Sequence, residues 1–471
     1  MSAGLFTRTA AAAAAMFFAP DAVAQSPGPA PNGNGKRHGF AASPEFARAP
    51  YTITIGEKDE AWKIGIYGFV EFNVMNDSTR SYADSAGAAV LQRDDTIGGQ
   101  HGRTHFTARN SRLGFKMEAP RYLGIKPGAV IEGDFFGNQP SNVSEASLLI
   151  SGGFRLRHAY VRLETDYVDV IAGESYALFG QNPYFFPASV QYLPFPNLVL
   201  FRTMQVRLSH RFRTDPIDVD VGVAAVRPQR DSAVPEGQAA IRLNFNYAKA
   251  VHAPGSGGPV VDPMALGISG LVRSLRVDEF SARPQHVNSA TSWGLTFNAM
   301  IPLIPAKGDD QKGHGLTLTG ALTIGTGIGD QLQTSAGVTF PQLPNPDKQN
   351  PAPVYTPDID NGLVVYDPNG ELRTIHWRTF VVGLQYYLPP AGRISLAANY
   401  SHGTSVNMPR LIGPSAAKQV YKQSRYFDAN VFFDITPAVR TGLSYQLTMQ
   451  TFVDDATARN HRWMLGVYYF F

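Results

Sequence analysis

A long, regular alternation of apolar and polar residues is the feature of this sequence that most limits its fold. Residues 440–450 carry a larger or more apolar side chain at every second position, and segments 292–301 and 241–247 repeat the pattern. A period of two predicts β-strands with one apolar and one polar face. Strands of soluble sandwiches usually have five or six residues, whereas a tilted strand needs about nine to eleven to cross a membrane. The length of the pattern therefore favours membrane-crossing strands.

The composition removes several other classes of protein. No stretch of 18 or more apolar residues follows Gln25, which excludes transmembrane helices and leaves a soluble secreted protein or a β-barrel. The chain has no cysteine, so disulfide scaffolds, zinc-thiolate sites and thiol catalysis are excluded. A net charge of +3 over 471 residues is too weak for a nucleic-acid interface, and we expect no nucleic-acid partner.

The N-terminal segment indicates export. Arg8 precedes a ten-residue apolar run, and Ala22-Val23-Ala24 has the small-x-small form that a signal peptidase accepts. Ten residues span only about 15 Å as a helix, half of a bilayer core of roughly 30 Å, which disfavours a membrane anchor. We therefore predict a signal peptide at 1–24, a Pro/Gly-rich periplasmic segment at 25–61 and a transmembrane barrel at 62–471.

The alternating segments predict sixteen strands, which begin near residues 62, 104, 127, 153, 167, 200, 217, 237, 264, 290, 313, 373, 392, 424, 437 and 459. Short turns such as 165–166 and 389–391 alternate with long loops near 77–103, 137–152, 179–199, 325–372 and 401–423. Bacterial outer-membrane barrels have this arrangement, and an even strand number leaves both termini in the periplasm. The predicted fold is an all-β, 16-stranded antiparallel transmembrane β-barrel in the bacterial outer membrane, wide enough for a water-filled channel.

The last predicted strand, 459–471, supports this assignment. It places Trp463, Leu465, Val467 and Tyr469 outward and stops on Phe471. An aromatic-rich amphipathic strand that ends in phenylalanine resembles the recognition signal of outer-membrane barrels. We expect Phe471 to engage the barrel-assembly machinery and the apolar outer face to contact outer-membrane lipid.

Charged residues opposite apolar neighbours are the candidate pore-lining residues, because Arg or Lys facing lipid at mid-membrane costs about 2 to 4 kcal/mol. The residues selected in this way are Arg112, Lys116, Glu132, Asp134, Arg162, Arg207 and Arg211. Arg207 and Arg211 would form a positive ladder that attracts anions, and acidic and basic groups on neighbouring strands would set up a transverse field across a constriction. The simpler alternative for each residue is a generic hydrated wall.

For three arginines the alternation leaves open whether the side chain faces the lumen. Arg109, Arg155 and Arg157 share the parity of apolar neighbours. They would lie beyond the membrane band, at a bulge or at a subunit contact.

The loop from Gln181 to Asn197 is too apolar for an exposed surface loop. It is the third long loop, and folding it into the lumen would hide its aromatic residues and narrow the pore. The predicted constriction residues are Tyr184, Phe185, Phe186, Tyr192 and Phe195. Packing at the barrel rim or against another subunit is the competing interpretation.

Six motifs in the first third of the predicted barrel resemble, in order, the DcaP-like trimeric outer-membrane porins: IYGFVEFN (66–73), TARNSRLGFK (107–116), IEGDFFG (131–137), LRHAYVRL (156–163), AGESYALFG (172–180) and QVRLSHRF (205–212). The resemblance implies a sixteen-stranded homotrimeric pore for small, often anionic solutes such as dicarboxylates. It also implies that Arg112, Glu132, Asp134 and Arg207 line the lumen. Family members may carry an N-terminal coiled-coil extension, where this chain has a Pro/Gly-rich segment.

Motifs of enzymes are missing from the sequence. It contains no H-E-x-x-H, G-x-S-x-G or P-loop motif, and its eleven histidines are scattered. We therefore expect no enzymatic activity, no metal and no cofactor. The predicted function is a porin for passive diffusion of small polar solutes with a mild preference for anions. The alternative is a barrel enzyme of the lipase type, or a surface adhesin.

Overall fold

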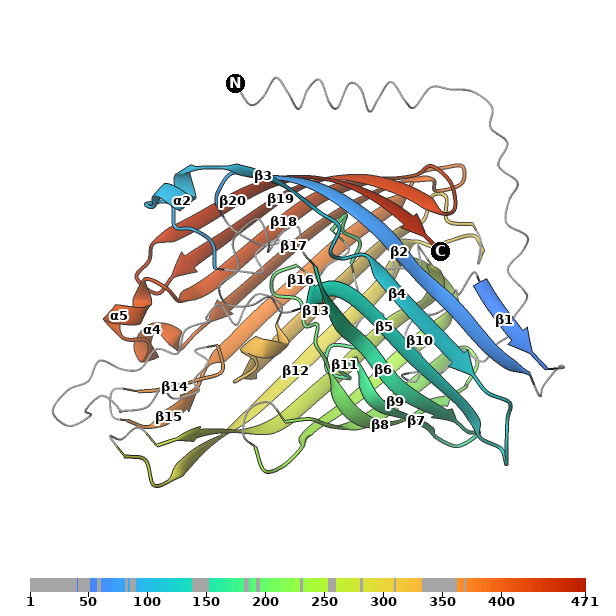
Figure 1. Cartoon of the computed structure of the whole chain (residues 1–471), viewed down its shortest axis with the longest axis horizontal. Coiled ribbons are helices and arrows are strands. Elements are labelled where there is room, and N and C mark those ends of the chain that lie inside the picture. Colours follow the sequence, from blue (N-terminus) through green and yellow to red (C-terminus); the bar gives the residue numbers. More distant parts are fainter. Residues whose placement is uncertain are drawn as a thin grey trace, which may run out of the picture. The chain divides into compact units, whose positions relative to one another are not determined.

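The computed structural model describes one large unit of the chain, in which a single sheet closes into a barrel (Figure 1). The described residues are 40, 51–56, 61–80, 84, 90–137, 152–181, 185, 187–191, 195–228, 232–252, 260–279, 283–308, 311–332, 362–367 and 370–471. The predicted signal peptide at 1–24 lies outside them. No helix among these residues is long and apolar enough to span a membrane.

The described residues contain sixteen wall strands, counted from the 18 strands of the sheet by omitting β1 (Tyr51–Ile55) and joining β3 to β4. The strands are β2 (Trp62–Asp77), β3 (Arg103–Thr107) with β4 (Arg112–Glu118), β5 (Lys126–Gly137), β6 (Gly153–Glu164), β7 (Asp169–Tyr176), β8 (Arg202–Phe212), β9 (Ile217–Val226), β10 (Glu236–His252), β11 (Val260–Asp278), β12 (Val287–Ile304), β13 (Leu316–Thr326), β16 (His376–Tyr387), β17 (Ile394–Ser405), β18 (Tyr421–Asp434), β19 (Val439–Phe452) and β20 (Thr457–Phe470).

Every wall strand pairs antiparallel with its neighbours, and β2 pairs with β20 to close the barrel. Figure 1 shows these first and last strands, blue and red, side by side. Each strand begins within four residues of its predicted start. The predicted fold class, a 16-stranded antiparallel barrel, is therefore confirmed.

The two faces of each strand explain why the sheet closes. On β8, Met204, Val206 and Leu208 are exposed on the outside, whereas Gln205 and Arg207 between them are buried on the inside. An outer surface of large exposed apolar side chains is stable only against lipid. A closed sheet also leaves no unpaired edge in the hydrocarbon region.

The connections follow the predicted asymmetry, with short turns at one end and mostly longer loops at the other. Residues 165–168, 213–216, 388–393 and 435–438 form short turns. The loops at the opposite end include 78–102, 177–201, 327–375 and 406–420, although β19 and β20 are joined there by residues 453–456 alone.

Two local features depart from regular strands. Residues 108–111 interrupt the second wall strand between β3 and β4, and both parts pair with β2. In addition, β1 lies within the segment 25–61 and pairs antiparallel with Trp62–Ile66 of β2. Regular structure therefore begins before residue 62, the predicted start of the barrel.

The long loops build an apolar core on the inner side of β11 and β16. Short elements of these loops, η3 (Gly329–Gln331), β14 (Val364–Tyr366), β15 (Leu372–Thr374), α4 (Met408–Leu411) and α5 (Pro414–Ala417), contribute to it or flank it. A further one-turn helix, α2 (Ile97–Gln100), lies in the loop before β3. In the core, Ile328, Val364 and Met408 pack with Leu275 and Trp377 of the wall.

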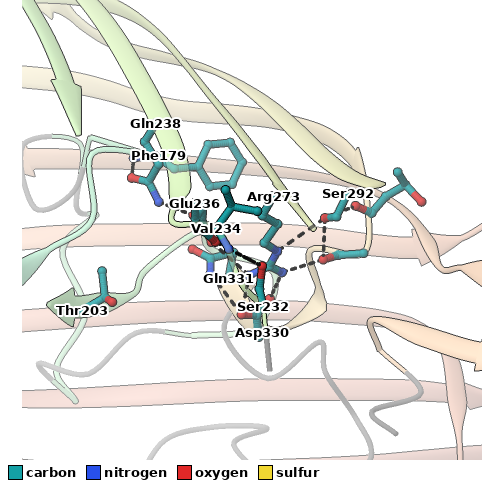
Figure 2. A network of polar contacts seen from close by, with 12 residues as sticks. Phe179, Thr203, Ser232, Val234, Glu236, Gln238, Arg273, Ser292, Asp330 and Gln331 are labelled. Atoms are coloured by element: carbon teal, nitrogen blue, oxygen red, sulfur yellow. Dashed lines mark hydrogen bonds and ion pairs between the residues drawn. The ribbon is translucent and has the colours of Figure 1, made fainter. Parts of the chain in front are cut away.

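An arginine fixes this loop core to the barrel wall. Arg273 of β11 donates from Nη1 to Asp330 Oδ2 at 2.9 Å and from Nη2 to the carbonyl oxygen of Gly327 at 2.5 Å. Its Nη1 also lies 3.3 Å from Glu236 Oε2 of β10. Figure 2 shows Arg273 between Ser292 on one side and Asp330 on the other, with Glu236 nearby. The contacts tie the start of the 327–375 loop to three wall strands.

Candidate functional site: the inner wall and the loop that crosses it

Two carboxylates and two arginines form a compact cluster on the inner wall. Glu132 and Asp134 of β5 are completely buried. Arg157 donates from Nε to Glu132 Oε1 at 2.6 Å and from Nη1 to Asp134 Oδ2 at 3.0 Å. Arg155 binds Asp134 through both Nε and Nη2, at 2.9 and 2.5 Å. Charge-assisted bonds of this bidentate kind are short and fix the orientation of both partners.

A β-bulge brings Arg157 into the lumen. Glu132 pairs with His158 and the next residue, Gly133, pairs with Leu156, so Arg157 is the extra residue on β6. A bulge of this kind re-aims one side chain relative to the simple alternation. This resolves the direction that parity left open: Arg155 and Arg157 both point to the carboxylates of β5.

The predicted transverse field requires acidic and basic groups that are separated from one another, and the structure places these groups in contact. Glu132 and Asp134 are in direct contact with arginines of the neighbouring strand, so the opposite charges compensate one another on a single wall. Arg109, the third open case, lies in the break between β3 and β4, and its Nε donates to Asp84 Oδ2 at 2.9 Å.

The other predicted residues of the early strands also face inward. Arg112 is buried, donates to Asn110 Oδ1 at 3.2 Å and lies 5.2 Å above the ring of Phe69. Lys116 is less buried and pairs with Glu118 at 3.1 Å.

Arg162 is buried close to this second group. It pairs with Glu164 at 2.7 Å and lies 3.7 Å from Glu118. These contacts place Arg162 in an acidic group near the turns, apart from the cluster of Glu132 and Asp134.

Arg211 belongs to a second ion-pair network, on β8 to β10. It binds Asp220 bidentately, at 2.5 and 2.9 Å, and Arg242 donates to the same carboxylate at 2.9 Å. The charge of Arg211 is therefore compensated, which makes the predicted ladder of Arg207 and Arg211 weaker than the sequence suggested.

Arg207 differs from the other buried arginines in its partners. It donates to Gln205 Oε1 at 3.0 and 2.8 Å, to the carbonyl oxygen of Phe40 at 2.9 Å and to that of Tyr176. All of these acceptors are neutral. Among the described residues, no carboxylate pairs with Arg207, so its positive charge is uncompensated.

Two arginine clusters, together with Arg112 and Arg207, carry an excess of positive charge on the inner wall. This set has six arginines (Arg112, Arg155, Arg157, Arg207, Arg211 and Arg242) and three carboxylates (Glu132, Asp134 and Asp220), which gives six minus three, or +3. We refer to these nine residues as the basic wall. The acidic group at Glu118 and Glu164 and the pair of Glu236 with Arg273 are not part of this set.

Sequence reasoning missed part of the basic wall. Asp220 lies opposite Val219 and Val221, and Arg242 opposite Ile241, so the parity rule could have selected both.

The third long loop, 177–201, crosses the inside of the barrel, and we call it the lumen loop. Near its start, Phe179 and Gly180 donate backbone N–H groups to Gln238 Oε1 and Ser269 Oγ, both at 2.8 Å. Further along, Asn399 donates to the carbonyl oxygen of Ala188 at 2.7 Å. The loop therefore bonds to inward-facing side chains of β10 and β11 and also of β17.

Aromatic residues of the lumen loop are buried against the opposite walls. Phe195 is completely buried and stacks on Tyr426 of β18, with ring centroids 4.9 Å apart. Phe185 packs with Ala250, Ala265 and Met300. The predicted constriction residues Tyr184, Phe186 and Tyr192 lie outside the described residues.

Within the part of the chain that the structure describes, no group of three or more His, Asp or Glu side chains could hold a metal ion.

No protein-family model and no curated protein sequence matches the chain. Solved structures do match: the outer membrane channel DcaP of Acinetobacter baumannii has a TM-score of 0.62 and 16% identity, over 88% of this chain and 99% of that one. The chain has the fold of this channel. The motif resemblance is thereby confirmed at the level of the fold.

Two further matches are weaker. The anion-selective porin from Comamonas acidovorans has a TM-score of 0.49 and 12% identity, over 87% of this chain and 100% of that one. OmpF of Salmonella typhi has a TM-score of 0.49 and 10% identity, over 89% and 100%.

Proposed function

We propose that the protein is an outer-membrane porin, a water-filled channel for passive diffusion of small hydrophilic solutes with a preference for anions. The observation that carries the proposal is the basic wall inside a sixteen-stranded barrel. Barrels of sixteen to eighteen strands leave room for an aqueous channel, whereas eight-stranded barrels are filled by their own side chains. A barrel whose interior is filled by side chains without water would not need a polar, charged inner face.

The charge of the wall supports the anion preference. Rings or rows of fixed arginines lower the energy of an anion in a narrow pore and raise that of a cation. The carboxylates of the basic wall are all held by arginines, so the excess positive charge of the guanidinium groups is what a passing anion would meet.

The resemblance and the basic wall both support a solute class. The DcaP-like porins are expected to take dicarboxylates, and a wall with two separate arginine clusters, at Arg157 and at Arg242, suits a solute that carries two negative groups. We include dicarboxylate-like solutes in the proposal on this basis.

The proposed setting is a homotrimer in the outer membrane, inserted by the barrel-assembly machinery. The apolar outer face of strands such as β8 supports contact with lipid. Phe471 exchanges backbone hydrogen bonds with Gly68, at 2.8 and 3.1 Å, so the C-terminal residue takes part in barrel closure.

Conductance in planar bilayers tests this function. The purified protein should give stepwise conductance, and a salt gradient should give a reversal potential biased toward anions. Replacing Arg207 and Arg211 together, Arg207→Gln and Arg211→Gln, should move that potential toward cations, because both are inward-facing. The control is Arg425→Gln, which removes one charge from the exposed outer side of β18 and should leave the potential unchanged.

Two results would contradict the proposal. A bilayer that stays silent with correctly folded protein refutes the pore and favours the barrel enzyme or the adhesin. A conducting channel whose reversal potential does not respond to the double replacement removes Arg207 and Arg211 from the selectivity.

A further inference from the structure

Phe40 precedes the first wall strand by 22 residues, yet it is only 6% exposed. Its neighbours in one apolar cluster are Leu178 of the lumen loop and the inward-facing Ala224, Val226 and Ala240 of β9 and β10. The wall residues among these neighbours face inward, so Phe40 lies inside the barrel. Phe40 therefore reaches the wall that the proposed function assigns to solute.

The backbone of Phe40 supplies an acceptor to Arg207. Nη1 of Arg207 donates to the carbonyl oxygen of Phe40 at 2.9 Å, and the remaining acceptors of Arg207 are the neutral oxygens of Gln205 and Tyr176. A buried guanidinium group without acceptors is costly, because its N–H groups have lost water. The Phe40 carbonyl thus takes the place beside Arg207 that an anion or water would otherwise fill.

The ring of Phe40 contacts a second arginine and fits at a position of the wall that has no side chain. The guanidinium carbon of Arg242 lies 5.0 Å from the ring centroid, within the range of a cation–π contact. A Cβ atom at Gly222 would come within 2.9 Å of the ring. The ring therefore fits against β9 because position 222 has no side chain.

We propose that Phe40 is a tethered plug, docked between Arg207 and Arg242, which narrows the path along the basic wall and competes with anions for Arg207. The inference rests on the proposed pore function. When Phe40 leaves, Nη1 of Arg207 becomes available to an anionic solute, and the space between the lumen loop and β9 opens. The docked state should pass less current and be displaced by anions that bind Arg207.

Single-channel recording of the full chain tests the plug. Phe40→Ala should increase the unitary conductance or the open probability, because the ring is removed while the arginines remain. Gly222→Ala should act in the same direction, because its added carbon crowds the ring out of its seat. The matched control is Phe380→Ala, which removes an exposed phenylalanine from the outer face of β16 and should conduct like the original protein. Unchanged conductance in both Phe40→Ala and Gly222→Ala overturns the plug.

Thiol labelling tests the seat without relying on conductance. The chain has no cysteine, so Phe40→Cys introduces a single thiol. In folded protein, a water-soluble thiol reagent should label it at least about tenfold more slowly than Tyr167→Cys, whose position is 86% exposed in a turn. Adding Arg207→Gln should raise the rate at position 40.

The two proposals can fail separately. Equal labelling of Phe40→Cys and Tyr167→Cys in a conducting protein overturns the plug and leaves the pore. If the original protein and Phe40→Ala are both silent in bilayers, the pore is refuted, and the plug is refuted with it even where position 40 is protected.

Discussion

The inner side of β5 to β10 and the inner side of β11 to β16 use the same alternating strands for different purposes. On β5 to β10 the inward residues include Asp134, Arg207 and Asp220, which bond to other polar groups of the wall. On β11 the inward residues Leu271 and Leu275 are covered by apolar loop residues. The inner face is charged where solute is proposed to pass, and it presents apolar residues such as Leu271 and Leu275 where the loop core packs.

The difference indicates where the proposed path for solute runs. The loop core and the lumen loop fill the side of β11 to β18 with buried apolar contacts, such as Ile328 against Leu275 and Phe195 against Tyr426. An anion gains little from an apolar surface and much from fixed guanidinium groups. Replacements on the loop side should therefore lower stability, whereas replacements on the basic wall should change ion selectivity.

The largest effect is expected from Arg273→Ala. This replacement leaves the buried Glu236 unpaired and releases Asp330, and removing one partner of a buried ion pair costs about 3 to 5 kcal/mol. The free energy of unfolding, measured by urea titration in detergent, should fall by about this amount. Arg276→Ala is the control, because Arg276 is on the same strand with no ion pair among the described residues. Equal losses in the two variants would show that the Arg273 contacts do not hold the loop core.

The next largest effect is expected from Phe195→Ala. The buried ring stacks on Tyr426, and removing a buried phenylalanine costs about 3 kcal/mol where the site relaxes in part, the lower end of the range for this replacement. Liposome swelling should also become faster with larger sugars, because the lumen loop loses an anchor on β18. Phe297→Ala, on the exposed outer face, should change neither property. Swelling rates that remain unchanged would mean that this part of the loop does not limit the pore.

Asp220→Asn should have a smaller effect on stability. Its effect on ion selectivity should be opposite to that of replacing Arg207 and Arg211. The replacement leaves Arg211 and Arg242 without their shared carboxylate and costs about 1 to 2 kcal/mol, since an amide still accepts a hydrogen bond. The reversal potential should move further toward anions. Adding Arg211→Gln should bring it back, because the count of charges returns to that of the original wall. A shift toward cations would contradict the basic wall as the source of selectivity.

The sequence predicted what depends on local pattern. Strand starts agree within four residues because side chains alternate with a fixed period of two. The predicted strand that begins near residue 264 is the long β11, Val260–Asp278. Its alternation is weak because Leu271 and Leu275 face the loop core while Val272 faces outward. A strand with two apolar faces carries no amphipathic signal.

Contacts between distant residues could not be predicted in this way. Parity placed Glu132 inside, but the bulge that turns Arg157 toward it depends on how β5 and β6 align. The docking of Phe40 on Arg207 joins residues 167 positions apart in the sequence. A single sequence contains the chemistry of both partners but not their distance.

The smallest effect is expected from Arg121→Ala, at the turn end of the barrel. Arg121 pairs with Asp166 at 2.9 Å, but both side chains are largely exposed, and pairs of this kind contribute less than about 1 kcal/mol. Salt at 0.1 M screens exposed charges beyond about 10 Å, whereas buried guanidinium groups are screened much less. The reversal potential of Arg121→Ala should therefore equal that of the original protein, while Arg207→Gln moves it. If both replacements shift it equally, charges at the rim select the ions, and the contrast between the two inner sides explains stability alone.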